Sequence, residues 1–208
     1  FNFDSLQGMI LNEEIARVKS RSFITINHNF QMTQDYISRL GNQRQKDTYL
    51  LKNEGEVLIG CDATYENFDH TDSSSITAEA KREGDYYLIN GSKKIVASGI
   101  NSDYFIISCK ISNEKQNNGL SLIIIPKFLK GNDVTKKLNI KDFNADFKII
   151  HFDNLKVPAE NLLGEENQSL DHIFNQNLIL SLSESASSVS NAELNLKATV
   201  EYINSQDY

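Results

Sequence analysis

The chain has 208 residues, of which 39% are hydrophobic and 24% are charged, a balance typical of a globular protein with a buried core. Its formal net charge of −7 argues against a nucleic-acid-binding surface, because phosphate binding requires clustered Lys and Arg side chains. The longest purely apolar run, Leu122–Ile125, is far too short to cross a bilayer, so we expect no membrane span. The first residue is Phe rather than Met, which indicates an excerpt of a longer protein.

The cysteine and histidine residues show no spacing typical of a metal site, and we expect none. Cys61 and Cys109 both fall in predicted strands, so the simplest interpretation is two buried free thiols in a reducing compartment. The protein is therefore expected in the cytoplasm, or in an organelle matrix if a targeting segment is missing.

Residues 1–56 are predicted to be helical and to form part of an N-terminal helical domain. Apolar residues recur with a period near 3.6 from Leu6 to Leu40, and Gly41 follows at a C-cap position. Asn42 can cap the next helix, because Gln45 stands three residues later and completes a capping-box pattern.

Residues 57–160 are predicted to form short antiparallel strands. Asn90-Gly91 is a turn dipeptide, and it stands between the strand-like runs Tyr86–Ile89 and Lys93–Val96. A third strand is expected from Tyr104. Several short strands connected by tight turns indicate a β-barrel or β-sandwich domain.

Residues 161–208 are predicted to begin a C-terminal helical domain, with helix from Ser169 onward. The serine-rich run Ser181–Ser190 keeps helical spacing and contains no Gly or Pro, so helix is favoured over the alternative, a flexible linker. Its small side chains would permit close helix packing. The fold class is therefore α+β, with an antiparallel β middle domain between N-terminal helices and the start of a C-terminal helical domain.

Two blocks of the sequence resemble the acyl-CoA dehydrogenase family. The first is GDYYLINGSK at Gly84–Lys93, followed by Gly99 and by Asp103–Phe105. The second is Phe147–Pro158, followed by NLLGE at Asn161–Glu165. The resemblance extends over nearly all 208 residues and implies the middle domain of that family with helical segments on both sides.

The resemblance implies an oxidoreductase in fatty acid metabolism that uses FAD and acts on acyl-CoA or another acyl thioester. In such an enzyme the flavin accepts a hydride and a carboxylate base removes the α-proton. A homo- or hetero-oligomer is expected. The resemblance places cofactor contacts at Asp62, Thr64, Tyr65, Thr71, Ile95, Ala97 and Ser98, and a substrate contact at Thr71.

The first flavin-contacting motif of the family aligns with residues 65–72 and is altered. Glu66 and Asp72 match, and Thr71 conservatively replaces a serine. The family's proline and both of its glycines are absent, and Phe68 and His70 stand where glycine lets the backbone approach a bulky ligand.

The second flavin-contacting motif aligns with Ile95–Gly99 and lacks the family's tryptophan, since the chain contains no Trp. Ile95 supplies no stacking and Ala97 no hydroxyl, although Ser98 offers a displaced one. Two family arginines align with Ser181 and Gln206. FAD binding is therefore expected to be weakened or lost.

No catalytic residue is assigned. The family's base usually lies further along the chain than Tyr208, and its less common position aligns with Leu180, which cannot act as a base. Glu184, one turn later, is a weak candidate, and this piece alone is expected to be inactive. Two alternatives remain open: a degenerate, non-catalytic partner subunit, and the flavin-dependent monooxygenase branch of the superfamily, which Ala-Ser-Gly at 97–99 resembles.

Overall fold

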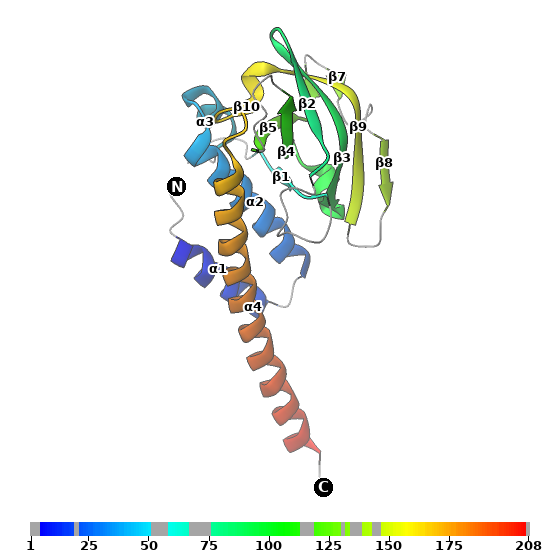
Figure 1. Ribbon diagram of the computed structural model, residues 1–208. Helices are drawn as coiled ribbons and strands as arrows, with labels where there is room; N and C mark the ends of the chain where they lie inside the picture. Colours follow the sequence, from blue (N-terminus) through cyan, green and yellow to red (C-terminus); the bar gives the residue numbers. More distant parts are fainter. Residues whose placement is uncertain are drawn as a thin grey trace.

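The computed structural model describes residues 5–18, 21–50, 58–66, 76–112, 119–129, 132–133, 139–142 and 147–206. N-terminal helices cover one side of a curved sheet, and one long helix, α4, runs past both (Figure 1). The α+β class and the order of helices, sheet and helix are as predicted.

The N-terminal helices follow the predicted pattern. They are α1 (Ser5–Arg17), α2 (Arg21–Leu40) and α3 (Gln43–Tyr49). The capping box is confirmed: the Asn42 side chain accepts the Gln45 backbone N–H at 2.9 Å, and the Gln45 side chain accepts the Asn42 N–H at 3.0 Å. These two bonds satisfy backbone donors that the first turn of α3 would otherwise leave unpaired.

The main sheet has the strand order β10-β5-β4-β2-β3-β9-β8, and β1 pairs with β4 outside this path. Its strands are β1 (Gly60–Ala63), β2 (Glu79–Glu83), β3 (Tyr86–Val96), β4 (Tyr104–Ser112), β5 (Ser121–Pro126), β8 (Asn139–Asp142), β9 (Phe147–Pro158) and β10 (Leu162–Leu163). A separate two-stranded hairpin joins β6 (Phe128–Leu129) to β7 (Asn132–Asp133). Short 3₁₀ helices, η2 (Ala97–Asn101) and η4 (Ala159–Asn161), follow β3 and β9.

The sheet is mixed, which corrects the prediction of antiparallel strands throughout. One edge of β4 pairs with β5 in antiparallel fashion, but its other edge is shared by β1 and β2, and both of these are parallel to it. Gly60 lies opposite Tyr104 at the start of β4, and Glu79 opposite Lys110 near its end. Turn signals reveal only neighbours in sequence, whereas these pairings join distant segments and depend on burial of the shared core.

The predicted turn at Asn90-Gly91 is wrong, because β3 continues straight through it. β3 pairs with β9 on both sides of Asn90, and the register shifts by one residue between Ile89 and Gly91, which marks a β-bulge. Gly91 has a φ of 126°, a conformation that suits glycine. The hairpin turn lies earlier, at Gly84-Asp85 between β2 and β3.

Gly91→Ala is expected to destabilise the fold by about 1–3 kcal/mol, because a Cβ would stand 2.7 Å from the Cα of Ala78 while φ stays positive. Gly84→Ala is the matched control: its φ is also positive, at 59°, but a Cβ there meets nothing within 4 Å. Urea unfolding of both variants measures the difference. Equal losses would show that the bulge tolerates a side chain.

Two hydrophobic clusters lie on opposite faces of β4. Phe105, Ile107, Cys109 and Ile111 point into the cluster enclosed by the sheet, which also contains Cys61. Tyr104 and Ile106 point the other way, into a cluster shared with α2 and α4. Both cysteines are buried free thiols, as predicted. Because side chains alternate between the two faces of β4, one face packs in the enclosed cluster and the other packs against the helices.

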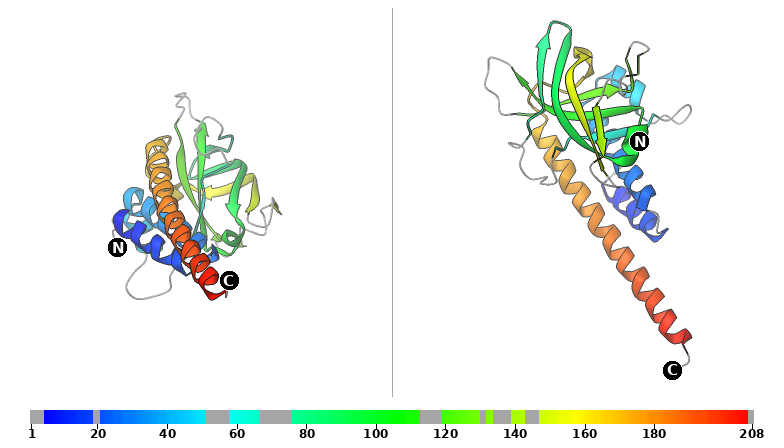
Figure 2. Two further views of the ribbon diagram at one scale, coloured as in Figure 1. Left: turned by 90° about the horizontal axis from the view of Figure 1, so that it is seen from below. Right: turned by 90° about the vertical axis from the view of Figure 1, so that its right-hand side faces the viewer.

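A single helix, α4 (Leu170–Ser205), contains the whole serine-rich run, so the linker alternative is wrong. Ser183, Ser187 and Ser190 are buried on the side that packs along α1 (Figure 2). The Ser187 hydroxyl donates to the backbone oxygen of Asn12 at 3.3 Å. Small side chains let the helices approach closely, as the sequence indicated. Several apolar residues of α4 are instead exposed, among them Phe174, Leu178, Leu182 and Val189.

No helix in the described part of the chain is both long enough and apolar enough to cross a membrane.

Candidate functional site

The end of β1 meets both α2 and α4, and this junction contains three of the predicted cofactor residues. The backbone N–H of Asp62 donates to the Asn29 side chain of α2 at 2.9 Å. The Tyr65 hydroxyl bonds to the Asn177 side chain of α4. The backbone oxygen of Tyr65 accepts the Lys94 N–H of β3 at 2.8 Å. The ends of β1 and β3 are therefore joined beside the two helices.

A buried ion pair fixes the backbone next to this junction. Lys93 is fully buried, and its ammonium donates to Glu66 at 2.8 Å and to the Ser108 hydroxyl at 2.9 Å. Burial lowers the pKa of Lys93, and the charge of Glu66 partly offsets this. Glu66 also accepts backbone N–H groups of Thr77 and Ala78. Glu66, which matched the family motif, thus ties β1 to the start of β2 and the interior of β3.

Asp62 is a buried carboxylate with one backbone partner. It is 8% exposed, and its side chain accepts the Thr64 N–H at 3.1 Å. Burial raises the pKa of Asp62 to about 6, although Thr64 and the charge of Lys93 act in the opposite direction. No ion pair joins Asp62 to another described residue within 4 Å.

Two hydroxyl groups beside Asp62 are buried, and although neither makes a hydrogen bond of normal geometry to a described residue, the Thr64 side chain lies near enough to lower the pKa of both Tyr36 and Asp62 as a hydrogen-bond partner. They belong to Tyr36 of α2 and to Thr64, each 1% exposed. Burial and the charge of Asp62 raise the pKa of Tyr36 well above its ordinary value. Sequence analysis placed Tyr36 only in an apolar stripe. The missed signal is that a buried tyrosine hydroxyl requires a polar partner.

The structure places the other predicted site residues differently. Ile95 is 1% exposed and belongs to the cluster enclosed by the sheet. Ala97 and Ser98 begin η2, directly after β3. Thr71 lies outside the described residues, as does the rest of the first motif after Glu66. Asp62, Thr64 and Tyr65 are therefore brought together, whereas Ile95 faces the core.

Ile95→Trp, which restores the family's residue, is expected to lower stability by about 1–3 kcal/mol, because the larger side chain would overpack the enclosed cluster. Thermal unfolding of the variant measures this loss, and Ile95→Val, which the site can accommodate, is the control. A Trp variant as stable as the parent would show that position 95 can turn out of the core.

The two positions considered for a base lie on α4. Leu180 packs against the cluster shared by α2 and α4, and Glu184 is exposed. The charge of Glu184 partly offsets the effect of burial, which lowers the pKa of His28. Among the described residues, no group of three His, Cys, Asp or Glu could hold a metal ion.

The comparisons with known proteins agree with this architecture. Residues 66–155 match the acyl-CoA dehydrogenase middle domain. The short-chain specific acyl-CoA dehydrogenase of Clostridium acetobutylicum is 30% identical over 168 residues, which are 79% of this chain and 44% of that protein. The crystal structure of an acyl-CoA dehydrogenase from Geobacillus kaustophilus superposes with a TM-score of 0.83 at 26% identity, covering 100% of this chain and 55% of that one. The chain belongs to the acyl-CoA dehydrogenase family.

The chain spans about half the length of these family members. The fold is also shared by a structure described as the FAD complex of PigA, with a TM-score of 0.79 at 22% identity, covering 98% of this chain and 54% of that one.

The residues at the end of β1 fit the edge of a flavin in their hydrogen-bonding capacity. The carboxylate of Asp62 is a polar group that a heterocyclic edge could satisfy, whereas the hydroxyls of Tyr36 and Thr64 are closed off at 1% exposure, as Ile95 is. Ile95 does not supply a stacking surface, because it is buried in the enclosed cluster.

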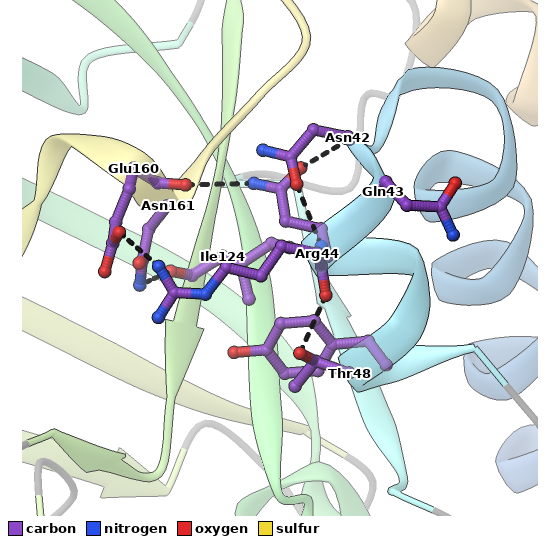
Figure 3. A pocket seen from close by; sticks show the side chains of 9 residues that line it. Asn42, Gln43, Arg44, Thr48, Ile124, Glu160 and Asn161 are labelled. Carbon is purple, nitrogen blue, oxygen red and sulfur yellow. Dashed lines mark hydrogen bonds and ion pairs between the residues drawn. The ribbon is translucent and has the colours of Figure 1, made fainter.

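A surface pocket of about 410 Å³ lies elsewhere, between α3 and η4 (Figure 3). Many of its polar groups already hold the fold together. The Gln45 amide donates to the backbone oxygens of Glu160 and Leu162, the Asn161 amide donates to that of Ile124, and Arg44 pairs with Glu160 at its exposed rim. The pocket therefore joins α3 to the strand edge.

Proposed function

We propose that the full-length protein is an acyl-CoA dehydrogenase-type flavoprotein that holds FAD and oxidises an acyl thioester. The observation that carries this proposal is the junction itself. The two segments that align with the family's flavin motifs are joined there by the Lys94–Tyr65 backbone bond and the Lys93–Glu66 ion pair. Membership of the family and the likeness to the FAD complex of PigA support a flavin in this place.

A bound flavin supplies the hydride acceptor for such an oxidation. The described residues would bind and orient the flavin. Asp62 and Thr64 stand at the edge of its site, and the Glu66–Lys93 ion pair holds their backbone in place. The α-proton requires a carboxylate within hydrogen-bond reach. Leu180 cannot serve and Glu184 is exposed, so we place the base outside the described residues.

The visible spectrum of the purified full-length protein, with and without added FAD, tests the proposal. FAD is expected to bind but to be lost on dialysis, because stacking at Ile95 and a cation at Gln206 are missing. Each lost bond to a charged group weakens binding by about tenfold or more, since such bonds contribute about 1.5–3 kcal/mol. A flavin retained stoichiometrically through dialysis would contradict the weakened site, and no binding at saturating FAD would contradict the flavoprotein.

A second candidate function is a non-catalytic subunit that pairs with an active family member. The burial of Ile95 in the core favours it, since that position cannot face a flavin without rearrangement. This candidate predicts a protein that binds no FAD alone and forms a stable complex with a flavin-containing homologue. Size-exclusion chromatography of the mixture, read at a flavin wavelength, separates the two candidates.

A further inference from the structure

The surface hollow between α3 and η4, the α3–η4 pocket, has the size of a small-molecule site. Its volume is about 410 Å³, within the range of about 300–1,000 Å³ that such sites occupy. Arg44 reaches across it from α3 and Glu160 from η4, and Asn161 lies beside Glu160 (Figure 3). The half-buried Tyr49 also lines it. The pocket therefore brings together one cation, one anion and two uncharged polar side chains.

Two polar groups of the α3–η4 pocket are not used by the fold. The Asn161 amide nitrogen donates to the backbone oxygen of Ile124, but its amide oxygen accepts no hydrogen bond from a described residue. The Tyr49 hydroxyl likewise has no hydrogen-bond partner in the described part of the chain, although its ring packs against Tyr104 with the centroids 4.7 Å apart. Burial raises the pKa of Tyr49, so its hydroxyl stays protonated at neutral pH. One acceptor and one donor are thus available to a ligand.

The ion pair across the pocket can exchange one partner for another. Arg44 and Glu160 meet at 2.5 Å, but their side chains are 76% and 58% exposed. Water already solvates both charges, so the pair contributes little to the stability of the fold and opens readily. Among the described residues, Glu160 accepts from one N–H of Arg44, whereas a guanidinium carries five in a fork that suits a carboxylate. The charges of Arg44 and Glu160 act in opposite directions on the pKa of Tyr49, which places its hydroxyl near both.

We propose that the α3–η4 pocket binds a free α-amino acid with an apolar side chain. Arg44 and the Tyr49 hydroxyl bind its carboxylate, while Glu160 and the Asn161 amide oxygen bind its ammonium group. A zwitterion carries both charges on one carbon, and the pocket holds the two opposite charges side by side. A simple anion would be repelled by Glu160, and a simple cation by Arg44. The accessible part of the Tyr49 ring offers the side chain an apolar surface.

This inference is independent of the proposed function, because none of these residues belongs to the junction at the end of β1. Ligand-observed NMR titration of the full-length protein at pH 7 tests it with three probes, in low salt so that exposed charges are not screened. L-Phenylalanine is the zwitterion, N-acetyl-L-phenylalanine lacks the ammonium group and L-phenylalanine amide lacks the carboxylate. L-Phenylalanine is expected to bind at least about tenfold more tightly than either analogue, because each analogue loses the hydrogen bonds of one charged group. Equal affinities for the three probes, or no binding of L-phenylalanine, would overturn the inference.

Arg44→Gln and Glu160→Gln are each expected to weaken L-phenylalanine binding about tenfold, and Tyr49→Phe roughly fivefold. Glu160→Gln should not weaken N-acetyl-L-phenylalanine, which has no ammonium group for Glu160 to bind. Arg39→Gln is the matched control, because Arg39 also forms an ion pair, at 2.7 Å from Asp35 on α2, but does not line the pocket. It should leave all affinities unchanged. Unchanged binding by the Arg44 and Glu160 variants, or an equal loss in the Arg39 variant, would overturn the inference.

Discussion

Lys93→Met is expected to lower the free energy of unfolding by about 3–5 kcal/mol, because removal of one member of a buried ion pair leaves an uncompensated charge. Lys93 is fully buried, and the side chain of its partner Glu66 is 7% exposed. The variant keeps the length and apolar stem of the side chain but leaves the Glu66 carboxylate without its cation. Urea unfolding at pH 7, followed by circular dichroism, measures the loss.

Lys81→Met is the matched control for this prediction. Lys81 also pairs with a glutamate, at 3.1 Å from Glu83, but the two side chains are 70% and 50% exposed. Such a pair contributes about 0–1 kcal/mol. The double variant Lys93→Met, Glu66→Leu should recover part of the loss, because it removes the stranded charge. A Lys93→Met variant as stable as Lys81→Met would show that water reaches Glu66.

Short-range patterns in the sequence predicted the helices well, because the groups that decide a helix lie within one turn. Asn42 and Gln45 form the expected capping box. The run from Ser181 to Ser190 is helical because nothing in it breaks a helix, and its serines face α1. The apolar residues of α4 were harder to place, since periodicity alone does not say which face meets a partner.

The sheet was harder to predict because its pairings join distant segments. Asn90-Gly91 carries the same local signal in a turn and in a bulge, and only pairing with β9 decides between them. The parallel neighbours of β4 likewise have no local signature. The antiparallel order was inferred from turn signals, and the one at Asn90-Gly91 proved to be a bulge rather than a turn.

The candidate site was predicted through the resemblance rather than through local chemistry. The resemblance to the family pointed to Asp62, Thr64 and Tyr65 as cofactor contacts, and the structure places all three at one junction. Tyr36 was missed because its position along α2 has the period of an apolar stripe. Its hydroxyl becomes informative only when the burial of its neighbours is known.

The difference in stability between Asp62→Asn and the parent protein is expected to grow by about 3 kcal/mol in favour of the variant between pH 4 and pH 8. Burial raises the pKa of Asp62 from 3.8 to about 6 in the folded protein. A carboxyl group with a raised pKa in the folded state stabilises the fold below the unfolded pKa, and this contribution is lost as the pH rises through the folded pKa. A difference of about two pH units corresponds to about 3 kcal/mol.

Asparagine retains an oxygen for the Thr64 N–H and does not ionise, so the variant lacks this dependence. Urea unfolding of both proteins at intervals from pH 4 to pH 8 gives the difference directly, and the other titrating groups cancel because both proteins contain them. The difference should rise from pH 4, change most steeply near pH 5, between the unfolded and the folded pKa of Asp62, and level off above pH 6. A difference that stays flat, or that falls as the pH rises, would mean that the Asp62 carboxylate is solvated or paired in the folded protein.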